Sequence, residues 1–181
     1  MENARDYTKL IARQTEVESA LATLDKFYFD RNKPSRFISG VALSSRKPNA
    51  NEDSFIAHGV NFSLPAPLLW DHDWARPLGR VLGIEVRGEK LHYRAEVGNA
   101  MPWTDQIWEA IKARTVEMSS VEGISLLDTV IERTYRSWQL REISVVQLGA
   151  DPGAIITRCA ERVPVIYVDG RPSETVHWSA P

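Results

Sequence analysis

From Phe37 onward the sequence consists of short β-type runs separated by turn residues, and this pattern restricts the fold more than any other feature. The clearest runs lie at 37–43, 54–58, 78–86, 90–97 and 140–148. Within 90–97 apolar residues alternate with polar or charged ones, which is the two-residue period of a half-buried strand. We therefore expect an antiparallel barrel or sandwich with few helices, a mainly β protein of the α+β class.

Two local signals lie between these runs. The segment 87–90, Arg-Gly-Glu-Lys, separates two β-type runs and predicts a hairpin turn. Residues 102–113 have helical character, because a proline suits the first turn of a helix and basic residues follow at its negative end. We expect the core face of this helix to be formed by Trp103, Ile107 and Ile111.

The first 28 residues form the longest stretch without Gly or Pro, and their apolar side chains follow heptad spacing. They predict an amphipathic helix, which either packs on its own domain or acts as an arm that pairs with another chain. The polar segment 30–35 contains a proline and is typical of a linker. We therefore divide the chain into an N-terminal helical arm and linker (1–36), a β-barrel domain (37–160) and a C-terminal tail (161–181).

Charge and cysteine content exclude several classes of function. The chain has 22 Lys and Arg against 24 Asp and Glu, so its net charge of −2 does not indicate a nucleic-acid partner. A single cysteine excludes an internal disulfide framework and a cysteine-rich zinc site. Apolar stretches are far shorter than the roughly 20 residues of a membrane span, and the N-terminus lacks an apolar signal core. We expect no membrane partner and no cofactor.

His72 is the histidine best placed for chemistry. It lies in Leu68–Val81, LLWDHDWARPLGRV, where an apolar strand leads into a polar turn that could present a side chain to a cleft. Asp71 and Asp73 flank it and raise the question of a metal site. If the stretch is extended, both Asp side chains point away from the face that carries His72. We therefore expect no metal site.

Serine nucleophiles and a carboxylate partner come from later in the chain. The candidate nucleophiles are Ser119, Ser120, Ser125, Ser144 and Cys159. A serine hydroxyl is a weak nucleophile at neutral pH and needs a nearby base. Glu142 is an acid among apolar strand residues, so it either pairs with a base such as Arg141 at the sheet surface or orients an imidazole.

Three blocks of the sequence together resemble the prohead maturation proteases of tailed phages. The first is the histidine block at 68–81, the second is AIKARTVEMSSVEG at 110–123, and the third is LREISVVQLGADPGAII at 140–156. Their order and spacing agree with that family over about 39–156. In the second block, Arg114, Val121, Glu122 and Gly123 stand where the family usually has Gly and then (Ile/Val)-Gly-Phe, so two glycines are absent.

This resemblance implies an assemblin-like β-barrel wrapped by a few helices, with an N-terminal helical arm, and a serine endopeptidase of Ser-His-Glu type. Ser120 would attack the scissile carbonyl, His72 would move the proton, and Glu142 would hold His72; a one-residue slip would choose Ser119 instead. The substrate would be scaffold protein or the scaffolding segment of the major capsid protein, with the enzyme itself as a further candidate substrate. It would act as a homo-oligomer inside the prohead, in the host cytoplasm.

Two other functions stay open. One is a capsid-assembly or scaffold-like protein on the same fold with weak or no activity, which the altered second block suggests. The other is an unrelated β-barrel binding module in which Trp70 and Trp74 would line a ligand groove. A Ser–His pair within hydrogen-bond reach would separate the protease from both.

Overall fold

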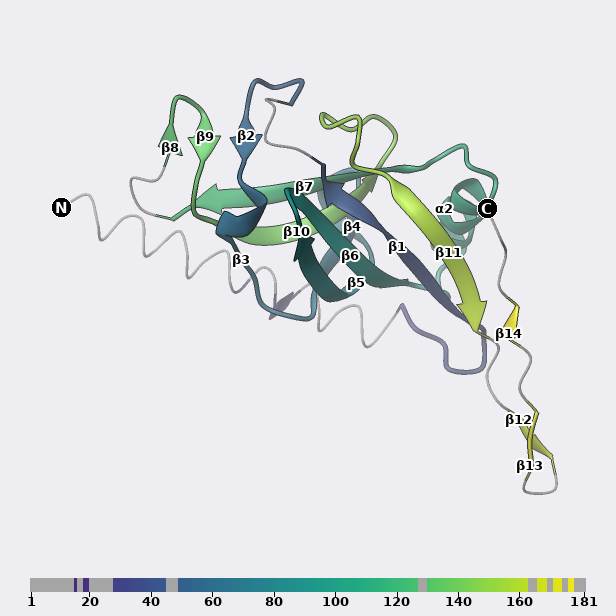
Figure 1. The fold of residues 1–181 in the computed structure, drawn as a ribbon. Helices are drawn as coiled ribbons and strands as arrows, with labels where there is room; N and C mark the ends of the chain where they lie inside the picture. Colours follow the sequence, from purple (N-terminus) through teal and green to yellow (C-terminus); the bar gives the residue numbers. More distant parts are fainter. Residues whose placement is uncertain are drawn as a thin grey trace.

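The computed structural model describes residues 15, 18–19, 28–44, 49–126 and 130–162, and the backbone of three short strands between 166 and 177. The largest part of the fold is one nine-stranded sheet (Figure 1). Its long strands are β1 (Ser35–Leu43), β4 (Ala66–Trp70), β5 (Asp73–Arg87), β6 (Lys90–Val97), β7 (Met118–Ser125), β10 (Trp138–Val146) and β11 (Ile156–Arg162). The short elements are β2 (Ser54–Phe55), η1 (Ala57–Gly59), β3 (Val60–Asn61), β8 (Val130–Ile131), β9 (Thr134–Tyr135), β12 (Ile166–Val168), β13 (Arg171–Ser173) and β14 (Val176–His177).

The strands of the large sheet follow the order β14-β11-β1-β6-β5-β4-β10-β3, and β7 pairs with β10 on its other side. Most neighbours are antiparallel, but β10 runs parallel to both β3 and β4. The expected closed barrel is wrong, because the sheet stays open. One isolated bridge joins Met118 of β7 to Ile155, the residue before β11. Beyond this bridge, β7 pairs with β10 and β11 pairs with β1.

Local periodicity predicted the β5–β6 hairpin correctly. The apolar side chains of β6 are nearly inaccessible to solvent: Leu91, Ala95 and Val97 are 0% exposed and Tyr93 is 3% exposed. The turn pairs Arg87 with Lys90 and contains Gly88 at a φ of 60°. Positive φ is the conformation for which glycine has no steric cost, so the turn residue and the turn geometry agree.

The expected strand at 54–58 is wrong in its second half. Strand β2 ends at Phe55, and the 3-10 helix η1 follows at Ala57–Gly59. Gly59 packs so closely against β10 that a Cβ atom there would lie 1.8 Å from the carbonyl oxygen of Arg136. This close approach lets the Trp138 indole N–H donate to the carbonyl of Ile56 at 2.9 Å. Contacts with a strand about 80 residues away therefore end the extended run.

The one α-helix with defined bounds in the described residues is α2 (Pro102–Lys112), close to its predicted range. Its core face differs from the expected one: Trp108 and Ile111 are each 1% exposed, whereas Trp103 and Ile107 are only partly buried. The Trp108 indole N–H donates to Glu161 Oε1 at 2.6 Å, which gives this buried ring a polar partner on β11.

Residues 28–34, which include most of the expected linker, are fastened to the domain by Asn99. Its Oδ1 accepts from the Asp30 N–H at 2.7 Å, and its Nδ2 donates to the carbonyls of Asp30 and Pro34, each at 3.0 Å. Asn99 is only 3% exposed, so these bonds are shielded from water. The rest of the expected arm, apart from residues 15, 18 and 19, lies outside the described residues.

Asn99→Ala should therefore destabilise the fold by roughly 1–3 kcal/mol, because it leaves shielded backbone groups without partners. The measurement is denaturant unfolding with a common slope for both proteins. Asn61→Ala is the matched control, since Asn61 is exposed and makes one weak bond of 3.4 Å to the carbonyl of Gly59. Equal unfolding midpoints for the two variants would show that the hydrogen bonds of Asn99 do not stabilise the fold.

Candidate active site

His72 lies in a two-residue turn between β4 and β5. Trp70 pairs with Asp73 across the hairpin, and the turn residues Asp71 and His72 have φ angles of 54° and 59°. Positive φ at both central residues is the signature of a type I′ turn, which tightens a hairpin sharply. The stretch around His72 is thus not extended, and the expectation that strand alternation would separate His72 from its two Asp neighbours does not apply.

Strand β10 holds this turn in place. The Asp71 N–H donates to the carbonyl of Val145 at 2.9 Å, and the His72 N–H donates to Ser144 Oγ at 3.0 Å. Both bonds come from the parallel pairing of β4 with β10, in which Trp70 is aligned with Val145. The strained turn is therefore positioned by a strand that follows it by about 70 residues.

Glu142 contacts the imidazole of His72. Glu142 Oε1 lies 2.6 Å from His72 Nδ1, and Glu142 Oε2 accepts from the Ser144 hydroxyl at 2.6 Å. The Glu142 side chain is 0% exposed, whereas that of His72 is 39% exposed. A buried carboxylate with two short hydrogen bonds thus anchors one ring nitrogen, and the other edge of the imidazole can reach solvent or a substrate.

A β-bulge at Arg141 aims Glu142 at His72. In the β7–β10 ladder, Leu140 is aligned with Gly123 but Glu142 is aligned with Glu122, so Arg141 is an extra residue. Before Arg141, the even-numbered residues Trp138 and Leu140 lie in the core. After Arg141, the odd-numbered residues Ile143 and Val145 lie in the core. The bulge reverses the alternation and sends Glu142 and Ser144 to the face covered by the His72 turn.

Ser119 and Ser120 lie on opposite faces of β7. Ser119 is aligned with the core residue Val145, is 0% exposed, and shares a hydrogen bond of 2.7 Å with the buried Tyr93 hydroxyl. Ser120 is half-buried and aligned with Ser144. Directly opposed residues of an antiparallel pair have Cβ atoms about 5 Å apart on one face. Ser120 therefore shares the face of Ser144, the residue that binds both Glu142 and the His72 backbone.

The electrostatic environment favours a protonated His72. The hydrogen bond to Glu142 raises the pKa of His72 above its usual value, the negative charges of Glu142, Glu122 and Asp71 act in the same direction, and partial burial opposes them. Burial raises the pKa of Glu142, whereas its bonds to His72 and Ser144 lower it. The two groups form a charge-assisted pair in which the carboxylate and the imidazole stabilise each other.

The departures from the family pattern in the second block have structural explanations. Arg114 follows α2 at a φ of 58°, the left-handed conformation that glycine usually supplies after a helix. Its guanidinium donates to the carbonyl of Ile156 at 2.9 Å, which fastens the helix end to β11. At Gly123, a Cβ atom would lie 2.4 Å from the Trp138 ring, so the indole fills the space of the missing side chain.

Sequence reasoning missed the positioning role of Ser144, which it had considered only as a nucleophile. The sequence contains a signal for it: large apolar residues fall on even positions at Trp138 and Leu140, and on odd positions at Ile143 and Val145. It also expected Trp70 and Trp74 to line a groove in the binding-module alternative. Trp70 is a core residue, 5% exposed, and Trp74 is only half-buried beside Arg141. A buried Trp70 does not line a groove at the surface.

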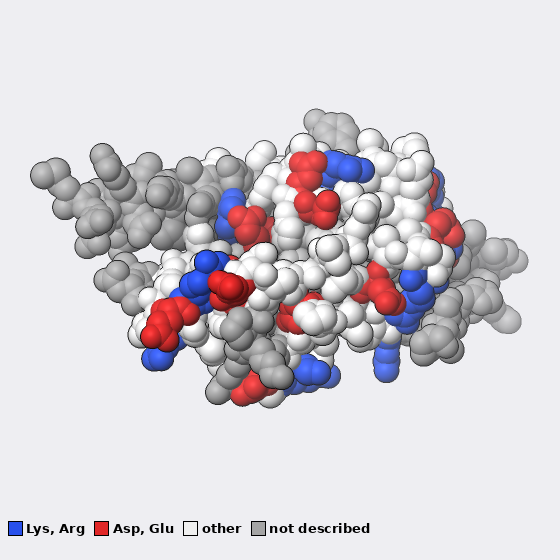
Figure 2. Space-filling view, turned by 90° about the horizontal axis from the view of Figure 1, so that it is seen from above, with Lys and Arg blue, Asp and Glu red and all other residues white. Residues whose placement is uncertain are grey.

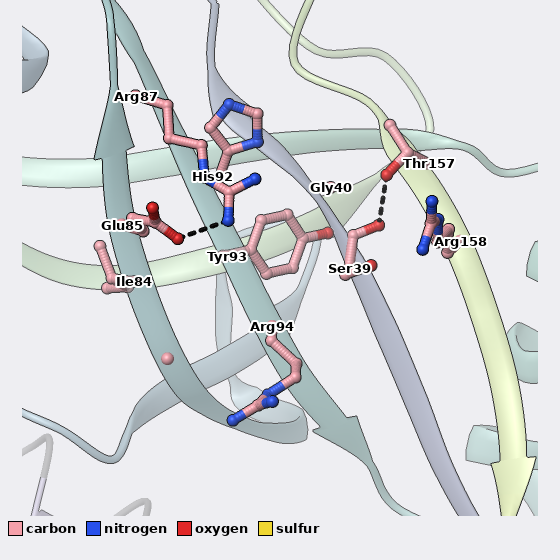
Figure 3. A pocket seen from close by; sticks show the side chains of 11 residues that line it. Ser39, Gly40, Ile84, Glu85, Arg87, His92, Tyr93, Arg94, Thr157 and Arg158 are labelled. Carbon is pink, nitrogen blue, oxygen red and sulfur yellow. Dashed lines mark hydrogen bonds and ion pairs between the residues drawn. The ribbon is translucent and has the colours of Figure 1, made fainter.

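A hollow of about 570 Å³ lies on another part of the sheet, over β1, β5, β6 and β11 (Figure 3). Ser39 stands between Arg94 and Arg158 at its floor, and Arg87 pairs with Glu85 at its side. Its lining includes none of the three candidate catalytic residues. On the face shown in Figure 2, acidic and basic side chains are interspersed.

Among the described residues, no group of three or more His, Cys, Asp or Glu side chains is arranged to hold a metal ion. No helix among the same residues has the length and apolarity needed to cross a bilayer.

The profile of the caudovirus prohead serine protease family matches residues 44–164, more than half of the chain. The chain belongs to this family. All three blocks that carry the resemblance lie inside the matched range, so the assignment made from the sequence is confirmed.

Other similarities cover parts of larger proteins. The capsid polyprotein of Pseudomonas phage PAJU2 is 33% identical over an alignment of 152 residues, and the match covers 76% of this chain but only 22% of that protein. Among solved structures, the KSHV protease in complex with a hexapeptide phosphonate inhibitor is similar over 70% of this chain and 64% of its own, with 12% identity and a TM-score of 0.48. Another KSHV protease structure has a TM-score of 0.45, at 12% identity, over 70% of this chain and 60% of its own.

Glu142→Gln should lower the pKa of His72, because an amide cannot supply the negative charge that stabilises the imidazolium. NMR titration of the His72 ring protons in the two proteins measures this directly. Glu96→Gln is the matched control, because it removes a partly buried carboxylate from an ion pair with Arg80 instead. An unchanged titration of His72 would show that the contact with Glu142 is not formed in solution.

Proposed function

We propose that this chain is a serine endopeptidase of phage capsid maturation, in which Ser120, His72 and Glu142 act together. The observation that carries the proposal is the 2.6 Å contact between His72 Nδ1 and the buried Glu142 carboxylate. Glu142 lies on the same face of β10 as Ser144, the register partner of Ser120. Membership of the prohead serine protease family supports the reaction class.

The contact at Nδ1 assigns a role to each ring nitrogen of His72. An ionised Glu142 can only accept, so Nδ1 carries the proton and Nε2 presents its lone pair. Nε2 takes the proton of the Ser120 hydroxyl as the oxygen attacks the scissile carbonyl, and then returns it to the leaving amine. Glu142 fixes this tautomer and stabilises the imidazolium that forms between the two transfers.

The environments of the two serines support Ser120 as the nucleophile. The hydroxyl of Ser119 is directed into the core and is engaged by Tyr93, so it has no access to a substrate. Ser120 is partly accessible and lies on the His72 side of β7. A substrate would reach it from the edge of the sheet, since among the described residues β7 pairs fully with β10 only. An extended peptide that adds to such an edge places its carbonyls along the strand.

The substrate is inferred from the relatives. The family acts in the prohead, and a protein named capsid polyprotein is similar to most of this chain, so a capsid or scaffold segment is the natural target. We place the enzyme inside the prohead for the same reason. Its self-cleavage and its homo-oligomeric state stay predictions.

A catalytically inactive assembly protein is the second candidate, because two family glycines are absent from the serine block. The structure of the serine block argues against an inactive protein. Arg114 keeps the left-handed backbone that a glycine would adopt, and Glu122, at the second glycine position, forms an ion pair with Arg141. The substitutions are thus accommodated without removing the contacts around His72.

Co-expression with the capsid protein of the same phage tests the function. Ser120→Ala should abolish cleavage of the capsid or scaffold segment, because the attacking oxygen is lost. Mass analysis of the products measures the cut. Ser119→Ala is the matched control: it should keep cleavage while lowering stability, since it removes the partner of the Tyr93 hydroxyl. Cleavage by Ser120→Ala would contradict the assignment, and absence of cleavage by the wild type would favour the assembly protein.

Cleavage should rise as pH increases through the pKa of His72, because only the neutral imidazole accepts the serine proton. This pKa is raised by Glu142, so the rise should be centred above the ordinary value of about 6.5. Cleavage rate against pH is the measurement. His72→Ala should lose nearly all activity, Glu142→Gln should lose less, and EDTA should have no effect. Inhibition by EDTA or an active His72→Ala variant would overturn the Ser–His mechanism.

A further inference from the structure

We propose that Glu122, clasped by Arg141 and Trp74, is a positioning residue of the candidate site: it fixes the bulge that aims Glu142 at His72 and adds a second negative charge beside the imidazole. This inference rests on the proposed function and concerns the same site. No family pattern stated above assigns a role to Glu122, which stands where the family usually has glycine.

The clasp consists of three side chains in mutual contact. An Arg141 guanidinium nitrogen lies 2.5 Å from Glu122 Oε1, and the Trp74 indole N–H donates to Glu122 Oε2 at 3.4 Å. The guanidinium carbon of Arg141 also lies 4.7 Å from the centre of the Trp74 ring, a cation–π distance. The Arg141 side chain is 10% exposed and that of Glu122 is 37% exposed, so the ion pair is partly shielded from water.

Each member of the clasp lies within two residues of a candidate catalytic residue in the sequence. Trp74 follows His72 by two positions at the start of β5, and Glu122 follows Ser120 by two positions on the same face of β7. Arg141 immediately precedes Glu142 on β10. The clasp therefore joins the three elements whose relative placement decides whether Ser120, His72 and Glu142 meet.

Arg141 is also the extra residue of the bulge. In the register of the two strands, no residue of β7 stands opposite Arg141. Here the side chain is tied across the ladder to Glu122, which is the register partner of Glu142. Without the Arg141–Glu122 ion pair, the contact that holds the bulge at position 141 is lost. A shift of the bulge would then turn Glu142 towards the core.

Glu122 also contributes to the charge around the imidazole. The charged groups that act on His72 are Glu142 from β10, Glu122 from β7 and Asp71 from its own turn, and all three raise the pKa of His72. Arg141 is the cation that partly offsets Glu122. A glycine at position 122 would supply neither the negative charge nor the ion pair with Arg141.

The charge is tested by Glu122→Gln, with NMR titration of His72 in the full chain. Removal of this nearby negative charge should lower the pKa of His72. Glu96→Gln is the matched control, because it removes a partly buried carboxylate from an ion pair with Arg80 on β5 and β6. An equal titration shift in both variants, or no shift in Glu122→Gln, would overturn the electrostatic part. The titration needs no substrate, so its result is separate from whether the chain is a protease.

The positioning is tested by Arg141→Lys, which keeps the positive charge but loses the forked guanidinium. We expect kcat for cleavage to fall roughly tenfold with KM little changed, because the His72–Glu142 geometry is loosened. The pKa of His72 should shift by less than in Glu122→Gln. An unchanged kcat in Arg141→Lys would overturn the positioning role. This second variant also decides the case if Glu122→Gln does not fold, as judged by its thermal unfolding.

Discussion

The contact between the buried Glu142 carboxylate and His72 is the interaction on which the candidate site depends. A carboxylate with no solvent exposure is tolerated in a core only when its oxygens are hydrogen-bonded and its charge is matched. Ser144 satisfies one oxygen and His72 the other. The same serine accepts the backbone N–H of His72, so the contact fixes both the imidazole and the strained turn that carries it.

The bulge at Arg141 makes this arrangement possible on a strand that is also central to the core. Strand β10 contributes Trp138, Leu140, Ile143 and Val145 to the hydrophobic cluster, yet it presents Glu142 and Ser144 to the site. A regular strand could not do both with these residues, because its side chains alternate strictly between two faces. One additional residue changes the phase of alternation, and the contacts of that residue with Glu122 and Trp74 link the core to the site.

The same reasoning explains how the chain departs from its family's serine block and still forms these contacts. The positive φ at Arg114 preserves the helix end, and the Trp138 ring replaces a side chain at position 123. The open sheet is compatible with this arrangement, because the pairings of β10 with β4 and β7 suffice to bring the three candidate residues to one face.

The sequence by itself determined the features that depend on neighbours along the chain. Alternation predicted β6 and its hairpin, the proline and basic residues predicted α2, and the order of three blocks predicted the family together with His72, Ser120 and Glu142 as candidates. Tertiary structure alone decided the turn geometry at His72, the bulge at Arg141, the opposite faces of Ser119 and Ser120, and the open sheet. Each of these follows from pairing between strands far apart in sequence. Local periodicity carries no information about which residue of a distant strand becomes the partner, and a shift of one residue exchanges the two faces.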